Sequence, residues 1–284
     1  MTAARLRVDD HARDAAGMTY VYPVVSRRAG GVSVGINLNP NNACNWRCVY
    51  CQVPDLKRGG PPPVALAQLE AELTTMLDEI VHGDFMLRRV PEGARRLNDV
   101  AFSGNGEPTM SPEFPAAVEL VGRVLARFGL AGRIRVVLIT NGSQLYKPAV
   151  QAAVEAMAGL GGEVWFKLDR APHDGFSAVN QVQLKAASVR LHLAAAVARC
   201  STWLQTCMFA LDDVLPDEAM LSAYLDFLAS LRRDGITLQG VLLYGLARPS
   251  MQAEASRLSP APAEWMQALA ARIESIGLPV KLSL

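Results

Sequence analysis

The feature that most constrains the fold is a repeated alternation of short apolar runs and amphipathic helical stretches. Six times along the chain, a run rich in β-branched residues is followed by a polar loop and a helical pattern. Strands that alternate with helices in this way pair in parallel through right-handed crossovers. The predicted strands lie at 32–38, 98–104, 133–140, 163–169, 201–209 and 237–246, and the predicted helices at 66–83, 111–129, 147–159, 176–199, 217–233 and 263–276.

Six such units are too few to close an eight-stranded barrel. We therefore predict an α/β fold, a partial (three-quarter) parallel (β/α)6 barrel. Since no linker interrupts the pattern, residues 1–284 are predicted to form a single domain. It would comprise an N-terminal extension at 1–30, the partial barrel at 31–250, and a C-terminal helix and strand at 251–284.

Local signals refine two of the helices. Ser111 and Pro112 fit the N-cap and first helical position of the helix predicted at 111–129. In the helix predicted at 217–233, apolar spacing places Met220 on the buried face together with Leu221 and Tyr224.

Composition narrows the function classes. Apolar residues make up 50% of the chain and the net charge is +1, so a large core is expected and a broad electrostatic surface for nucleic acid is not. The N-terminus is charged and lacks an apolar signal region, and no run of about 18 apolar residues predicts a membrane span. We expect a cytoplasmic protein without membrane association, in a compartment where clustered cysteines favour metal binding or catalysis.

Three of the five cysteines, Cys44, Cys48 and Cys51, fall within eight positions in the stretch NPNNACNWRCVYCQVPD. Iron–sulfur clusters usually take four cysteines, so three would leave one iron of a cubane without a protein ligand. An open coordination position is typical of a reactive metal rather than a structural one. The alternatives are a structural zinc ion, a thioredoxin-like Cys-x2-Cys redox pair, and chance clustering of buried thiols. A zinc ion would need a distant fourth ligand from His11, His173, Cys200 or Cys207.

The stretch CNWRCVYC resembles the C-x3-C-x-aromatic-C signature of radical S-adenosylmethionine (radical SAM) enzymes. The resemblance implies that Cys44, Cys48 and Cys51 hold a [4Fe–4S] cluster whose open iron binds the amino and carboxylate groups of SAM. It further implies reductive cleavage of SAM to a 5′-deoxyadenosyl radical that abstracts hydrogen from a substrate. Tyr50 stands at the aromatic position that packs against adenine. An electron donor such as flavodoxin or ferredoxin is implied as a partner.

Two further loops match the family at the ends of predicted strands, where barrels of this kind carry their chemistry. SGNGEPT resembles the glycine-rich motif whose backbone carbonyls approach the ammonium of SAM, and glycine permits that approach. The loop ITNGS resembles the segment that reaches the SAM carboxylate or ribose. The cofactor-binding candidates from these loops are Gly104, Asn105, Gly106, Glu107, Thr140, Asn141 and Ser143.

The remaining candidates come from the later strands. Lys167 and Asp169 lie on the same face of one strand, where they would contact SAM or substrate, or pair with each other at the barrel mouth. Gln205 is a candidate ribose or substrate contact if its face of the strand points inward, and part of the polar face of the strand if it points outward. The resemblance places Leu246 beside the adenine. Arg248 would bind an anionic group through its planar guanidinium. Lys167, Asp169 and Arg248 are the candidate catalytic residues.

The combination of SGNGEPT, TNGS, KLD and LYGLARPS resembles compact core-domain radical SAM proteins related to wyosine-synthesis (tRNA 4-demethylwyosine synthase-like) enzymes. No cysteine precedes Cys44, however, to bind the second cluster of those enzymes. Three classes stay open: an enzyme acting on a small molecule or peptide, an RNA-modifying enzyme, and a non-enzymatic zinc- or cluster-binding module. A glycyl-radical activase is a further candidate. The RNA class predicts a basic rim, for which the residues would be Arg27, Arg28, Lys57 and Arg58.

Overall fold

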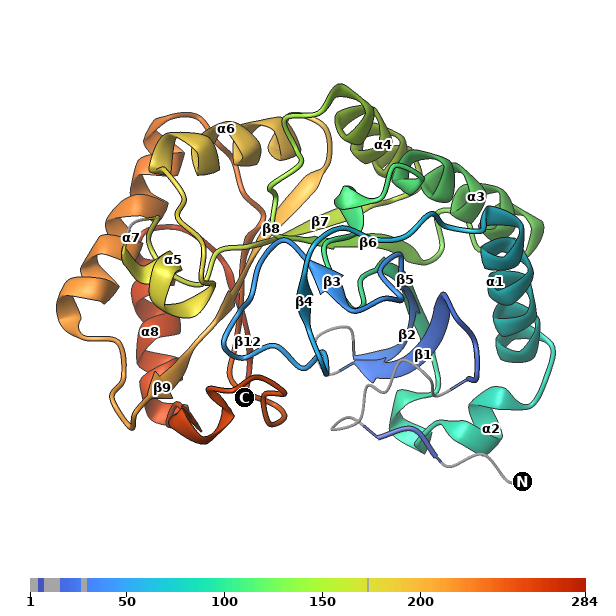
Figure 1. Cartoon of the computed structure of the whole chain (residues 1–284), viewed down its shortest axis with the longest axis horizontal. Coiled ribbons are helices and arrows are strands. Elements are labelled where there is room, and N and C mark those ends of the chain that lie inside the picture. The colour runs from blue at the N-terminus through green and yellow to red at the C-terminus, as the bar shows by residue number, and fades with distance from the viewer. Residues whose placement is uncertain (1–4, 8–15, 27–29, 173) are drawn as a thin grey trace.

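The centre of the molecule is an eight-stranded, curled sheet (Figure 1). The computed structural model describes residues 5–7, 16–26, 30–172 and 174–284. The strand order is β1-β2-β5-β6-β7-β8-β10-β12, parallel from β2 to β12, with β1 antiparallel to β2. The strands are β1 (Val21–Ser26), β2 (Gly31–Ile36), β5 (Leu97–Phe102), β6 (Arg135–Thr140), β7 (Glu163–Lys167), β8 (Ser201–Cys207), β10 (Gly240–Tyr244) and β12 (Val280–Ser283). The six predicted parallel strands and the partial barrel are confirmed, and β1 and β12 extend the sheet at its two edges.

The main helices form an outer arc around this sheet (Figure 1). They are α1 (Leu66–Val81), α3 (Phe114–Arg127), α4 (Pro148–Gly159), α6 (Ala186–Val197), α7 (Glu218–Arg233) and α8 (Ala263–Ser275), with the short helices α2 (Phe85–Arg89) and α5 (Asp174–Val179). Two small sheets pair β3 (Ala43–Cys44) with β4 (Lys57–Arg58) and β9 (Phe209–Leu211) with β11 (Leu258–Pro260). Short 3₁₀ turns occupy η1 (Glu92–Ala94), η2 (Pro108–Met110) and η3 (Ala255–Arg257).

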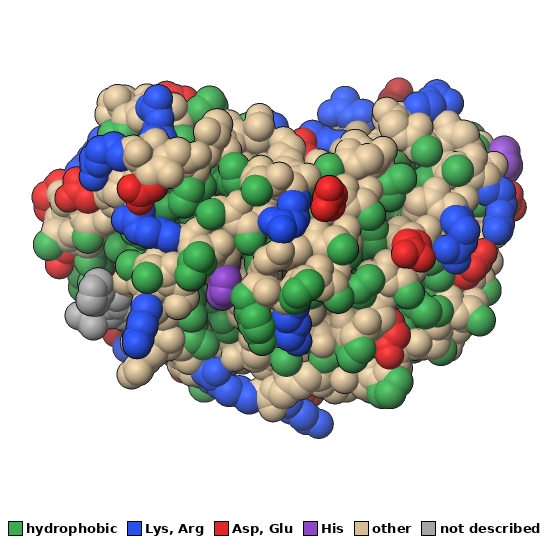
Figure 2. Space-filling view, turned by 90° about the horizontal axis from the view of Figure 1, so that it is seen from above, with side chains coloured by type: hydrophobic (Ala, Val, Ile, Leu, Met, Phe, Trp, Pro, Cys, Tyr) green, Lys and Arg blue, Asp and Glu red, His purple; other side chains and the backbone are tan. Residues whose placement is uncertain are grey.

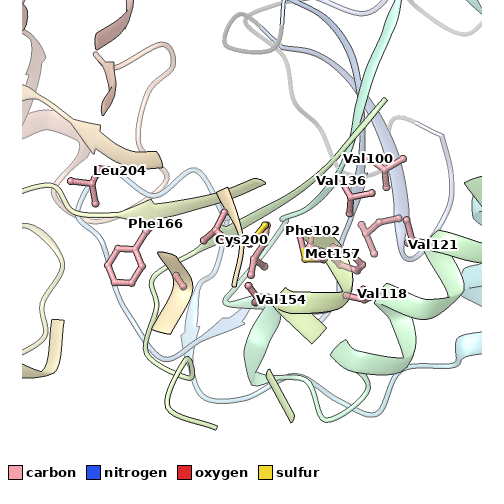
Figure 3. Close-up of a cluster of buried hydrophobic side chains, with 14 of the residues drawn as sticks. Val100, Phe102, Val118, Val121, Val136, Val154, Met157, Phe166, Cys200 and Leu204 are labelled. Carbon is pink, nitrogen blue, oxygen red and sulfur yellow. The ribbon is translucent and has the colours of Figure 1, made fainter. Parts of the chain in front are cut away.

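The core between helices and sheet follows the period-2 alternation of the strands. Val100 and Phe102 of β5 point outward and pack with Val118 and Val121 of α3, all fully buried (Figure 3). The alternate residues Asp99 and Ala101 therefore point into the barrel. Such interior positions line the site described below.

Three local predictions were wrong. Helix α3 begins at Phe114, because Ser111 instead ends the turn η2 and accepts a hydrogen bond from the Glu113 amide (3.3 Å). The helix predicted at 176–199 is two helices, α5 and α6, separated at Asn180–Lys185. Met220 is 48% exposed, whereas Leu221 beside it is buried; the backbone amide of Met220 donates to the side chain of Asp217, the N-cap of α7, at 2.8 Å.

On the molecular surface, basic and acidic side chains are interspersed where the molecule is seen from above (Figure 2). Among the described residues, Glu70 of α1 pairs with Arg123 and Arg127 of α3. In these same parts of the chain, none of the helices combines the length and apolar character needed to cross a bilayer.

Replacing Phe102 with alanine tests the outer core. The ring is fully buried and meets Phe114 edge-to-face at 5.3 Å between centroids. Such truncations cost about 3–5 kcal/mol of unfolding free energy. Urea denaturation should show this loss, whereas Leu87→Ala, at a side chain that is 64% exposed, should change stability by less than about 0.5 kcal/mol. Equal stabilities of the two variants would contradict the packing described.

Candidate functional site

A cavity of about 260 Å³ lies on the inner face of the sheet. Its rim is formed by the cysteine loop and by the loops that follow β5 and β10. Its deeper wall comes from the strands themselves and includes Ser33, Asp99, Ala101, Trp165 and Gln205. The cavity therefore extends from the carboxyl ends of the strands, where barrels of this kind have their active sites, into the barrel interior.

The three clustered cysteines, Cys44, Cys48 and Cys51, are half-buried and line this cavity together. Burial raises the pKa of Cys44 to about 11 and that of Cys48 to about 12. Both thiols therefore hold their protons at neutral pH unless a bound cation displaces them. The amide of Trp46 donates to Cys44 Sγ at 3.4 Å.

A segment almost 200 residues away holds the end of the cysteine loop. Ser250 Oγ donates to the carbonyl of Val49 at 2.7 Å. Gln252 Nε2 donates to the carbonyl of Val53 at 2.9 Å, and the Met251 amide donates to that of Cys51, also at 2.9 Å. These bonds fix the backbone around the third cysteine. Sequence reasoning missed them, because polar residues in a loop carry no signal of so distant a partner.

The middle of the cysteine loop is fixed by a bidentate ion pair. The guanidinium of Arg47 binds both carboxylate oxygens of Glu254, at 2.9 and 3.1 Å, and also the side-chain oxygen of Gln181 at 2.8 Å. These bonds raise the pKa of Arg47 and lower that of Glu254. Arg58 donates from the other side to the carbonyls of Asn45 and Gln181.

The linker between α5 and α6 docks directly on the second cysteine. Asn180 Nδ2 donates to Cys48 Sγ at 3.2 Å and to Asp169 Oδ2 at 2.8 Å. Beside it, the amide of Val49 donates to the carbonyl of Val179 at 2.9 Å. No sequence pattern points to Asn180, because the sequence predicts a continuous helix through this position.

Asp169 is completely buried behind the cavity wall. Its carboxylate accepts hydrogen bonds from Tyr50 Oη at 2.5 Å and from the Cys207 amide at 2.9 Å. Lys167 Nζ lies 5.0 Å from the centroid of the Tyr50 ring. Burial alone would lower the pKa of Lys167, but Tyr244 and Asp169 outweigh it and raise that pKa. Lys167 thus remains a cation in the cavity wall, whereas Asp169 does not line the cavity.

The loop Gly104–Glu107 lines the cavity, and its glycines also touch the cysteine segment. A Cβ at Gly106 would lie 2.1 Å from the carbonyl oxygen of Ala43, and one at Gly104 (φ 128°) would lie 2.5 Å from Asn37 Oδ1. Asn105 Nδ2 donates to Asn42 Oδ1 at 2.7 Å. Close packing of two loops therefore already requires these glycines, besides the approach to a cofactor that the sequence predicts.

Glu107 connects this loop to the one after β6. Its carboxylate accepts from Thr140 Oγ1 and from the Asn141 amide, both at 2.6 Å, and from Thr109. Burial raises the pKa of Glu107, although these hydrogen bonds oppose the shift. Thr140 is buried behind the cavity and does not line it.

Asn141 and Ser143 both bind Asn45 of the cysteine loop. Asn141 Nδ2 donates to Asn45 Oδ1, and Asn45 Nδ2 donates to Ser143 Oγ, each at 2.8 Å. Asn141 also lines the cavity, whereas Ser143 lies outside it. The TNGS loop therefore also supports the cysteine loop, at Asn45.

Gln205, Leu246 and Arg248, three of the candidate ligand contacts, all line the cavity. Gln205 is 1% exposed, and its Oε1 has no hydrogen-bond partner among the described residues. A buried amide oxygen without a partner is unfavourable, so this one is placed to accept from a bound molecule.

The other proposed metal ligands are dispersed. Cys200 lies in the outer core, where its Sγ donates to the carbonyl of Gly162 at 3.2 Å (Figure 3). Cys207 lines the cavity, and His11 and His173 lie outside the described residues. Within the described part of the chain, no three His, Cys, Asp or Glu side chains are arranged to hold a single metal ion.

Residues 38–175 match the model of the Radical SAM superfamily, and this match contains the cysteine loop and the loops after β5 and β6. This segment belongs to the radical SAM superfamily. The cofactors of radical SAM proteins are a [4Fe–4S] cluster and SAM. The site fits these cofactors, because three thiols share one rim, two of them already accept hydrogen bonds, and a partly polar cavity adjoins them.

Known proteins resemble the chain over part of their length. It is 28% identical over 130 residues to a GTPase Obg of Brachyspira hyodysenteriae, covering 46% of this chain and 16% of that one. It is 27% identical over 138 residues to a UPF0026 protein of Helicobacter pylori, covering 47% and 38%. Among solved structures, a radical SAM methyltransferase from Sphaerobacter thermophilus superposes with a TM-score of 0.58 at 15% identity, covering 89% of this chain and 66% of that one. The structure of SuiB from Streptococcus suis, bound to precursor peptide SuiA, superposes with a TM-score of 0.56 at 10% identity, covering 88% of this chain and 48% of that one. These superpositions show the shared fold.

Replacing Gly106 with alanine tests the contact between the glycine loop and the cysteine loop. The new Cβ would overlap a backbone oxygen, so one loop must move, which we expect to destabilise the fold by about 1–3 kcal/mol. Chemical denaturation measures the loss. Gly93→Ala is the matched control, since nothing lies within 4 Å of its Cβ position. A Gly106→Ala protein as stable as this control would show that the two loops do not pack as described.

Proposed function

We propose that this protein is a radical SAM enzyme in which Cys44, Cys48 and Cys51 bind the [4Fe–4S] cluster and a small molecule or peptide is the substrate. The observation that carries the proposal is the position of these three half-buried thiols on one rim of a cavity that continues into the barrel. Three thiolates leave one iron available to SAM, the arrangement expected of a reactive cluster.

The bound cofactors would supply the difficult chemistry, reductive cleavage of SAM to a radical that abstracts hydrogen from the substrate. The protein would position and shield the reacting groups. The residues proposed to contact SAM from the cavity wall are Tyr50, Gly104, Asn105, Gly106, Glu107, Asn141, Lys167, Gln205 and Leu246. Thr140 and Ser143 would support these contacts from behind, through Glu107 and Asn45.

The charges in the cavity wall suggest how a ligand is oriented. Lys167 stays protonated and would attract the carboxylate of an amino-acid moiety, such as that of SAM. Arg248, on the loop after β10, would bind a second anionic group with its planar donors. Asp169 would act indirectly, because it is buried and holds Tyr50 in place.

The size of the cavity limits the substrate. Its volume of about 260 Å³ lies just below the usual range for small-molecule sites, about 300–1,000 Å³. Because the residues proposed to contact SAM line the same cavity, we propose that only a compact group, from a small molecule or one residue of a peptide, enters beside the cofactors. SuiB, with a related fold, is bound to a precursor peptide, which makes a peptide the second substrate class to test.

An RNA substrate of the wyosine-synthesis type has less support. Of the predicted basic rim, Arg27 and Arg28 lie outside the described residues, and Arg58 is engaged in holding the cysteine loop. Lys57 and Arg58 are both exposed, and Lys57 is the one described member of this set whose side chain is not used to hold that loop. A zinc-binding module would be recognised by colourless protein that contains zinc after purification without oxygen.

Replacing Cys48 with alanine tests the cluster ligands. After anaerobic reconstitution, we expect Cys48→Ala to lose most of its iron and most of the cluster's absorption at the violet end of the visible spectrum. The variant should also release no 5′-deoxyadenosine from SAM under reducing conditions. Cys200→Ala is the control and should keep both, because its thiol lies in the outer core. Loss of iron in the Cys200 variant, or its retention in the Cys48 variant, would overturn the assignment.

Replacing Gln205 with leucine tests the unpaired oxygen in the cavity. Loss of one hydrogen bond, worth about 0.5–1.5 kcal/mol, should weaken SAM binding by up to about tenfold in calorimetric titration of the reconstituted protein. The fold should not lose stability, since the change removes a buried oxygen that lacks a partner among the described residues. Gln68→Leu, on the outer helix α1, is the matched control. Unchanged SAM affinity in Gln205→Leu would remove this residue from the site.

A further inference from the structure

The side chain of Asn180 lies outside the cysteine loop and contacts the sulfur of a proposed cluster ligand. It lies in the linker between α5 and α6, is fully buried, and is 132 positions from Cys48 in the sequence. Its Nδ2 contacts two groups, Cys48 Sγ at 3.2 Å and Asp169 Oδ2 at 2.8 Å.

The orientation of this amide follows from its neighbours. The carboxylate oxygens of Asp169 already accept hydrogen bonds from Tyr50 Oη and from the Cys207 amide, and the nitrogen of Asn180, rather than its oxygen, is the donor that faces them. The second N–H of the same nitrogen is then available for the sulfur. The amide oxygen has no partner in the described parts of the chain, so the hydrogen bonds that orient this side chain are those of its nitrogen.

The backbone fixes the distance between the amide and the sulfur. The amides of Arg47 and Val49 donate to the carbonyls of Asn180 and Val179, at 3.3 and 2.9 Å. These two hydrogen bonds, one on each side of Cys48, therefore hold the loop and the linker in one register. Asp169 is in turn held by Tyr50 and by the Cys207 amide.

We propose that Asn180 is a positioning residue that raises the reduction potential of the cluster by donating a hydrogen bond to Cys48 Sγ. The inference rests on the proposed function, in which Cys48 is a cluster ligand. Reduction adds negative charge to the cluster and its thiolates, so a donor to sulfur stabilises the reduced form more than the oxidised form. Asp169 contributes by aiming the amide at the sulfur.

The test compares the midpoint potentials of reconstituted proteins. Asn180→Leu removes the donor and keeps a side chain of similar size. Gln181→Leu is the matched control, since Gln181 contacts the same loop through Arg47 and Glu254 but donates to no sulfur. Each protein is loaded anaerobically with iron and sulfide, its iron content is measured, and it is titrated with a reductant while the paramagnetic signal of the reduced cluster is recorded.

We expect Asn180→Leu to keep its iron and to be harder to reduce, with a reduction equilibrium constant about tenfold smaller, equal to about 59 mV for a one-electron couple. The Gln181→Leu midpoint should match that of the wild type. If the leucine variant does not fold, Asn180→Ser replaces it, because the shorter side chain also cannot reach the sulfur and causes no steric clash. Equal midpoints in wild type and the Asn180 variant would overturn this inference alone. A wild-type protein that takes up no cluster would instead overturn the proposed function.

Discussion

The docking of the cysteine loop onto three separate parts of the barrel is the constraint on which the site depends. A loop with three thiols has no regular structure of its own apart from the two-residue strand β3. Its shape comes from bonds to residues 250–254, to the α5–α6 linker and to the TNGS loop. Since these segments are anchored to strands β10, β7 and β6, the rigidity of the sheet is transmitted to the sulfurs.

Asp169 has a central position in this arrangement. A buried carboxylate is unfavourable unless several donors compensate it, and here Tyr50, Asn180 and the Cys207 amide do so. Through the first two donors, one residue at the end of β7 orients both an aromatic ring and a hydrogen bond to a cysteine. The sequence placed Asp169 beside a ligand, whereas the structure places it behind the residues that would touch one.

Much of the fold was predictable because it depends on local patterns. Alternating strands and amphipathic helices predicted the parallel sheet, and the spacing of Cys44, Cys48 and Cys51 predicted the kind of site. What could not be predicted are contacts over long sequence separations, such as Ser250 to Val49 and Asn180 to Cys48. Helix periodicity even concealed Asn180, because apolar spacing continues across the break between α5 and α6. The glycines of the GNGEP loop are predicted to approach the cofactor, and the structure shows a second reason for them, close packing against Asn37 and Ala43.

The central claim is that three cysteines leave one iron of a [4Fe–4S] cluster open to SAM. Its most direct test is the electron paramagnetic resonance spectrum of the anaerobically reconstituted and reduced wild-type protein, recorded with and without SAM. We predict the spectrum of a reduced [4Fe–4S] cluster that changes when SAM is added, because SAM binds the iron that lacks a cysteine. A cluster spectrum that is identical with and without SAM, or no cluster spectrum at all, would contradict it.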